Sequence, residues 1–152
     1  MAVTAADLEW MKIALEEAER ARDLGEVPIG AVLVAGGLEV ARGGNRTRAD
    51  VDATAHAEIV VLRAAARVRG DARLGGTLYV TLEPCLMCMG ALVQARVLRL
   101  VYGADDPKAG AAVSLYEIAA DERLNHRFVV DGGALADECG ALLTAFFRER
   151  RP

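Results

Sequence analysis

Two short motifs constrain the fold of this chain more than any other feature of its 152 residues. The first is His-Ala-Glu at positions 56–58, and the second is Pro-Cys-Leu-Met-Cys at positions 84–88. On a helix, Cys85 and Cys88 lie three residues apart and share one face, so both thiols can point at one ion. A single metal held by His56 and the two cysteines requires two helix starts to converge at the ends of neighbouring strands.

The donor atoms of these motifs predict a catalytic zinc site. One imidazole and two thiolates are ligands that zinc prefers, and three protein ligands leave the fourth tetrahedral position for water. The metal lowers the pKa of that water towards neutrality. Glu58 does not have same-face spacing with His56, so we expect it to face the water and move protons rather than ligate the metal. The pattern predicts hydrolytic chemistry.

Two other interpretations of the cysteines remain open. A Cys-x-x-Cys pair can be a redox pair, although no thioredoxin-like context surrounds this one. A structural zinc site needs four protein ligands, and Cys139 or His126 are the candidates for the fourth. The apolar pattern of the last helix places Cys139 on its core side. His126 has no partner at metal-ligand spacing, so we expect it to cap or hydrogen-bond a loop.

Length and composition predict one domain, residues 1–152, with a core of alanine, valine and leucine, because aromatic residues make up only 5% of the chain. No apolar run is long enough to span a bilayer, and charged residues interrupt the N-terminal segment, which predicts a cytoplasmic protein with no membrane partner. The number of cysteines is odd and two of them form a Cys-x-x-Cys pair, which in a reducing compartment favours metal binding over a disulfide framework.

The net charge of −4 argues against a general nucleic-acid or membrane binder, and no DNA partner is expected. Arginines nevertheless cluster in three places, which suits either a solvated face or a local phosphate-binding surface. The clusters are Arg42, Arg46 and Arg48; Arg63, Arg67, Arg69 and Arg73; and Arg148, Arg150 and Arg151.

Hydrophobic periodicity predicts an α/β protein with partly parallel strand pairing. Thr4 and Asp7 have the spacing of a capping box at the first helix, and Pro84 suits the first turn of the third. Ser114 is expected to cap a short helix. Strands are predicted at 29–35, 38–42, 77–82, 97–102 and 128–131, and the main helices at 7–24, 54–70, 85–96 and 135–150.

Several segments resemble the bacterial tRNA-specific adenosine deaminases, within the zinc-dependent cytidine and deoxycytidylate deaminase superfamily. These segments are residues 26–32, 54–58, 77–85, 103–108, 125–127, 135–139 and 146–148. The resemblance implies a cytidine-deaminase-like, three-layer αβα sandwich with a central mixed five-stranded sheet, usually a homodimer. It implies hydrolytic deamination of adenosine to inosine at the wobble position of a tRNA anticodon, by a hydroxide that the metal activates, with one Zn²⁺ per subunit.

The resemblance also assigns the site residues. His56, Cys85 and Cys88 would bind zinc, and Glu58 would be the proton shuttle. Asn45 matches the loop asparagine that contacts the flipped nucleoside, although an asparagine after two glycines can also simply hold a turn. Val27 and Ala57 match family positions that surround the base in its pocket. Asp106 and Lys108 match a family loop that lies beside the bound RNA. The partner would be a tRNA anticodon stem-loop, because an adenine inside a stem could not reach a recessed metal.

The chain departs from the family pattern at Ala53, where a proline is common, at Met89, where the residue is usually small, and in residues 46–51. It ends at Pro152 without the basic tail of some relatives, so RNA affinity is less firmly implied than the chemistry. The zinc motif alone also fits a deaminase of a free base, nucleoside or nucleotide, such as cytidine, deoxycytidylate or guanine. A non-catalytic zinc-stabilised binding module is a third interpretation, and the retention of Glu58 argues against it.

Overall fold

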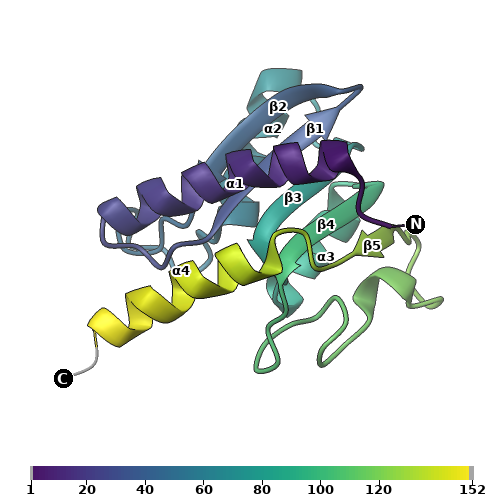
Figure 1. Ribbon diagram of the computed structural model, residues 1–152. Coiled ribbons are helices and arrows are strands. Elements are labelled where there is room, and N and C mark those ends of the chain that lie inside the picture. The colour runs from purple at the N-terminus through teal and green to yellow at the C-terminus, as the bar shows by residue number, and fades with distance from the viewer. Residues whose placement is uncertain (1, 151–152) are drawn as a thin grey trace.

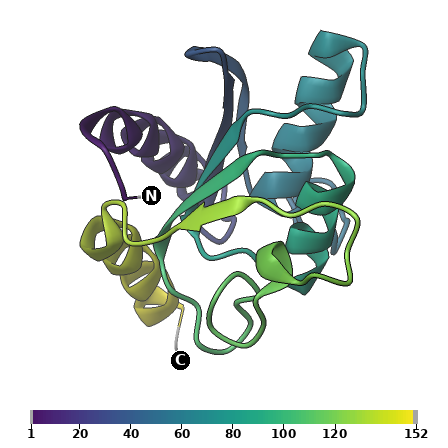
Figure 2. The same ribbon diagram turned by 90° about the vertical axis from the view of Figure 1, so that its right-hand side faces the viewer.

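A computed structural model describes residues 2–150 of the chain, as a five-stranded sheet between two layers of helices (Figures 1 and 2). Helices α1 and α4 cover one face of the sheet, and α2 and α3 lie on the other face. The elements are, in chain order, α1 (Ala5–Asp23), β1 (Gly30–Ala35), β2 (Leu38–Gly44), α2 (Ala57–Arg69), β3 (Thr77–Leu82), α3 (Leu86–Gln94), β4 (Arg99–Ala104), the short 3-10 helix η1 (Ile118–Ala120), β5 (Val129–Asp131) and α4 (Ala136–Glu149).

The strand order in the sheet is β2-β1-β3-β4-β5. Strand β1 is antiparallel to both β2 and β3, whereas β3, β4 and β5 are parallel. Strand β2 therefore runs in the same direction as β3, and the carboxyl ends of four strands meet at one edge of the sheet. This mixed sheet between helices confirms the predicted fold class.

Successive residues of the strands point to opposite faces of the sheet, so their side chains pack in two separate hydrophobic cores. Leu33, Leu78 and Leu100 belong to the core under α2 and α3, while Val32 and Val101 face α1 and α4. Helix α1 begins with the predicted capping box between Thr4 and Asp7. It also packs tightly on the sheet, because a Cβ atom at Gly30 would overlap the carbonyl oxygen of Ala14.

A buried ion-pair network centred on Arg99 joins helix α1 to the parallel strands. Arg99 donates from both terminal nitrogens to the Asp7 carboxylate at 2.8 Å, and from Nε to Asp131 at 3.0 Å. The Tyr79 hydroxyl donates to Asp7 at 2.7 Å. These contacts tie the start of α1 to β3, β4 and β5.

Several predicted boundaries were wrong. Strand β4 begins at Arg99 rather than at position 97, because its pairing with β3 begins opposite Thr77. Pro84 precedes the N-cap of α3 instead of lying in its first turn, and α2 begins only after His56. Ser114 caps no helix, because its hydroxyl donates to the carboxylate of Glu83.

No helix within residues 2–150 is both long and apolar enough to cross a membrane. Arg151, which was counted in the predicted C-terminal arginine cluster, and Pro152 lie outside the described residues.

Candidate active site

The two sequence motifs meet at the carboxyl edge of the sheet. His56 is the N-cap of α2, and Cys85 is the N-cap of α3, directly after β3. Cys88 lies one turn further along α3 and is fully buried. The two helix starts therefore converge as predicted. Both cysteines lie at the N-terminus of α3, where free backbone N–H groups favour the thiolate form.

The three predicted ligands have the separations that zinc requires. His56 Nδ1 lies 3.6 Å from Cys85 Sγ and 3.5 Å from Cys88 Sγ. Tetrahedral coordination, with zinc–nitrogen bonds of about 2.0–2.1 Å and zinc–sulfur bonds of about 2.3 Å, separates the two donor types by about 3.6 Å. All three donor atoms lie within 4.8 Å of one another, so the residues fit a zinc ion.

The two cysteines differ in the direction of their pKa shifts. The hydrogen bond from Cys88, with a second contribution from His56, lowers the pKa of Cys85 to about 4. Donation to Cys85, together with burial, raises the pKa of Cys88 above its usual range. The Cys85 thiolate in turn raises the pKa of His56. The lowered pKa of Cys85 favours the thiolate form in which a cysteine binds a metal ion.

Glu58 is placed beside the ligands without being part of the ligand group. Its side chain is 4% exposed and lines a cavity of about 180 Å³ together with His56, Cys85 and Asp106. Burial raises the pKa of Glu58 to about 7, so this carboxyl group can take up and release a proton near neutral pH. That position agrees with the predicted proton carrier.

A larger groove of about 850 Å³ adjoins this cavity, and the two share the residues Leu82, Asp106 and Ala109. The predicted substrate residues Val27, Asp106 and Lys108 line the groove. Helix α4 forms its other side with Leu143, Thr144, Phe147 and Arg150. Sequence reasoning missed this contribution of α4, although the adjacent phenylalanines Phe146 and Phe147 cannot both face the core from one helix, and Phe147 is half-exposed.

Asn45 and Ala57 differ from the other predicted substrate residues. Ala57 is fully buried in the core under α2 and α3, so its side chain packs there. Asn45 is 6% exposed, and its Nδ2 donates to the carbonyl of Val27 at 3.5 Å. Its Oδ1 is buried without a hydrogen-bond partner among the described residues.

The candidates for a fourth protein ligand lie elsewhere. Cys139 is 1% exposed and packs in the core under α1 and α4, as predicted. His126 Nε2 is hydrogen-bonded to the carbonyl of Val97 at 2.7 Å, which confirms its predicted loop role. Within residues 2–150, the only group of three or more suitable side chains is His56, Cys85 and Cys88. A structural four-ligand site therefore has no support in this part of the chain.

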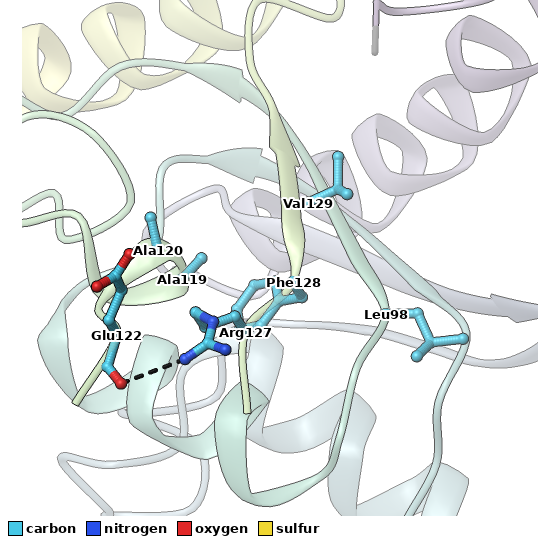
Figure 3. A pocket seen from close by; sticks show the side chains of 7 residues that line it. All are labelled: Leu98, Ala119, Ala120, Glu122, Arg127, Phe128 and Val129. Carbon is cyan, nitrogen blue, oxygen red and sulfur yellow. Dashed lines mark hydrogen bonds between the residues drawn. The ribbon is translucent and has the colours of Figure 1, made fainter. Parts of the chain in front are cut away.

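A separate hollow of about 660 Å³ lies beside η1 and the start of β5 (Figure 3). Leu98, Ala119, Ala120, Glu122, Arg127, Phe128 and Val129 line it. The guanidinium of Arg127 turns back to donate to the carbonyl of Glu122 at 3.2 Å. None of His56, Glu58, Cys85 and Cys88 lines this hollow, so it is separate from the candidate active site.

Fold and site together define the class. A three-layer sandwich with one histidine and two cysteines at paired helix starts, and with a buried glutamate beside them, is a zinc-dependent deaminase. A family model described as the cytidine and deoxycytidylate deaminase zinc-binding region matches residues 4–104.

Curated relatives show which branch of the deaminase family this chain resembles. The tRNA-specific adenosine deaminase of Bacillus subtilis (strain 168) is 50% identical over 143 residues, which are 93% of this chain and 89% of the relative. The Agrobacterium fabrum (strain C58) protein of the same name is also 50% identical, over 93% of this chain and 94% of its own length. This chain belongs to the deaminase family of the matching model and, within it, to the tRNA-specific adenosine deaminases.

Solved structures show the same fold. One from a study of A-to-I editing by tRNA:A34 deaminases at the wobble position has a TM-score of 0.86 and 48% identity, covering 89% of this chain and 99% of that chain. The guanine deaminase of Nitrosomonas europaea has a TM-score of 0.81 and 26% identity, covering 95% of this chain and 86% of that chain.

Proposed function

We propose that this chain deaminates adenosine to inosine at the wobble position of a tRNA anticodon. The observation that carries the chemistry is the buried Glu58 carboxyl group in a cavity beside a three-residue zinc site. The substrate follows from family membership, since the relatives at 44–50% identity are tRNA-specific adenosine deaminases.

When bound by His56, Cys85 and Cys88, zinc supplies a Lewis acid that makes water nucleophilic near neutral pH. Glu58 accepts a proton from the attacking water and delivers it to N1 of the adenine ring as the C6–O bond forms. A second proton passes through Glu58 to the exocyclic amino group, which leaves as ammonia when the C6–N bond breaks. Burial of Glu58 beside the metal site keeps bulk water away from the carboxyl group, which can therefore carry both protons in turn.

The cavity and the groove suit different parts of an RNA loop. A cavity of about 180 Å³ is recessed and holds the reacting base, which must be splayed out of its stack. The neighbouring groove carries the cationic side chains Lys108 and Arg150 and the exposed ring of Phe147. Cations and aromatic faces are the groups that bind phosphates and unstacked bases. The groove therefore accommodates nucleotides that flank the wobble position.

Asn45 contacts the flipped nucleoside in this proposal. A buried carbonyl oxygen without a partner costs about 1–3 kcal/mol, which a donor on a bound ligand can recover. The Oδ1 atom of Asn45 is such an oxygen, whereas its Nδ2 atom donates a hydrogen bond to the carbonyl oxygen of Val27. A hydroxyl group of the ribose would satisfy it. Asn45 lines a separate hollow with Arg42 and Arg46, which shares no residue with the cavity of Glu58, so its contact with the nucleoside is part of the proposal.

The functional unit is a homodimer with one zinc ion in each single-domain subunit. Exposed apolar side chains occur at the start of α3 and in the 105–117 loop, two segments joined by the backbone contacts of Cys85 with Gly110 and of Pro84 with Ala111. These side chains are Leu86, Met87, Val113, Leu115 and Tyr116. A second copy of the chain would remove this surface from water. Leu115→Lys should then give a monomer in sedimentation velocity, and a monomeric unmodified protein would contradict the assignment.

A cytoplasmic location fits the three free cysteines, because cytosolic proteins keep their thiols reduced. It also fits a tRNA substrate.

The test compares substrates directly. Metal-assayed protein is incubated with an anticodon stem-loop that carries adenosine at the wobble position, and separately with free cytidine, adenosine and guanine. Inosine in the RNA alone supports the proposal. Turnover of only a free compound would favour the second candidate, a free-base deaminase such as the guanine deaminase that shares this fold.

A further inference from the structure

Glu83 is a buried carboxylate that the zinc chemistry leaves without a role. It is 2% exposed and lies between the end of β3 and the ligand Cys85. The carboxylate accepts five hydrogen bonds, all from the segment that follows β4. The donors are the backbone N–H groups of Asp106, Ala112, Val113 and Ser114, at 2.9–3.2 Å, and the hydroxyl group of Ser114.

The segment that Glu83 holds has little regular structure of its own. Residues 105–117 contain no helix or strand, and a single isolated bridge pairs Gly110 with Cys85. The segment wraps closely around the carboxylate, because a Cβ atom at Gly110 would overlap the Glu83 carboxyl group. Buried backbone N–H groups need hydrogen-bond acceptors. In this segment the Glu83 carboxylate is the acceptor for four of them, those of residues 106 and 112–114.

The same segment forms the substrate walls. Asp106 and Ala109 line the cavity that contains Glu58, and residues 106–109 line the adjoining groove. The backbone N–H of Asp106 donates to Glu83 at 3.0 Å, while its side chain accepts from the N–H groups of Lys108 and Ala109. The position of Lys108 is thus set through Asp106, and the position of Asp106 is set by Glu83.

We propose that Glu83 is a positioning residue for substrate binding: it fixes the 106–114 segment against Cys85, so that Asp106 and Lys108 form the wall on which the RNA loop binds. This inference rests on the proposed function. Two carboxylate oxygens can accept from all five donors, whereas an amide would present an NH₂ group to some of them. Glu83 also lines the cavity that contains Glu58, but both of its carboxylate oxygens already accept hydrogen bonds from the segment, so its role is to hold the segment in place.

The test uses Glu83→Gln, which keeps size and shape, and Ser114→Ala, which removes only one donor. Asp7→Asn is the matched control, because Asp7 is an equally buried carboxylate, on α1, that binds Arg99 at the amino end of β4 and lines neither the cavity nor the groove. For each variant, zinc content, hydrogen exchange of the 106–114 amides, and kcat and KM on the wobble-adenosine stem-loop are measured.

We expect Glu83→Gln to keep its zinc, to exchange the 112–114 amides at least about tenfold faster, and to raise KM about tenfold with a much smaller change in kcat. Ser114→Ala should give the same changes in weaker form. Asp7→Asn should lower stability and leave KM unchanged. A rise in KM for Asp7→Asn that equals the rise for Glu83→Gln would reduce Glu83 to a stability role and overturn the proposal.

The two proposals fail separately. If unmodified protein leaves the stem-loop unreacted, the proposed function is wrong, while amide exchange still reports whether Glu83 holds the segment. If the stem-loop is deaminated but Glu83→Gln changes neither amide exchange nor KM, the positioning role alone is wrong.

Discussion

Replacing Arg99 by methionine should destabilise the protein strongly without impairing the active site. The guanidinium binds Asp7 through two hydrogen bonds of 2.8 Å and Asp131 through one of 3.0 Å. The side chains of Arg99, Asp7 and Asp131 are 13%, 3% and 8% exposed, so water cannot replace the lost cation. Methionine would leave two carboxylates facing each other in a nearly dry environment.

The size of the loss follows from that burial. Removing one partner of a buried ion pair costs about 3–5 kcal/mol, because the remaining charge is left uncompensated. For a chain of this length, 1 kcal/mol shifts the Tm by about 2–4 °C, so the Tm should fall by about 6–20 °C. Thermal unfolding followed by circular dichroism measures this loss. Arg123→Met is the control, because Arg123 pairs with Asp121 but is 89% exposed, and its Tm should stay unchanged.

The pH dependence provides a second readout. In the native protein, hydrogen bonds from Arg99 hold the pKa of Asp7 well below its usual range. A lowered native pKa contributes stability that is present above the unfolded pKa of about 3.9 and is lost as the pH falls through the native pKa. In Arg99→Met the buried carboxylates have raised pKa values, so acidification from pH 7 to pH 5 should narrow the gap to the native protein. A Tm loss below 2 °C, or a gap that widens on acidification, would refute this reasoning.

Three further predictions concern the site and its support. Glu58→Gln should retain zinc and lose at least about a hundredfold in kcat, as metal analysis and inosine yield will show; loss of the metal instead would mean that Glu58 is a ligand. Cys88→Ala should fail to retain zinc through dialysis, since it removes one of three ligands, and retention at full stoichiometry would contradict the ligand set. Gly30→Ala should lower the free energy of unfolding by about 1–3 kcal/mol in urea titrations, because the added methyl group overlaps the Ala14 carbonyl; an unchanged midpoint would show that α1 can shift at little cost.

Local patterns in the sequence predicted most of the elements. The capping box at Thr4 and the strand Thr77–Leu82 are present as predicted, because each is specified by neighbouring residues. The start of β4 was not predictable from composition, since Val97 and Leu98 are apolar, but the ladder begins only where Thr77 of β3 provides a partner. Strand β2 similarly extends through Gly43 and Gly44 because they pair with β1.

The grouping of His56, Cys85 and Cys88 was predictable from the sequence, because their spacing places them at two helix starts. The groove could not, because it joins Lys108 to Phe147 and Arg150, which are distant in the chain and meet only through packing. Ser114 shows the same limit: its sequence context predicts a helix cap, whereas tertiary structure brings it to the buried Glu83 carboxylate.

The central claim is that a zinc-binding site with Glu58 as proton carrier acts on the wobble adenosine of a tRNA. Competition in one tube tests it most directly: zinc-loaded protein is mixed with a stem-loop bearing adenosine at the wobble position, a stem-loop with that adenosine moved by one position, and free guanine and cytidine. Mass spectrometry then gives relative kcat/KM values from the products. The account predicts inosine almost entirely at the wobble position; faster formation of xanthine or uridine from the free compounds would contradict it.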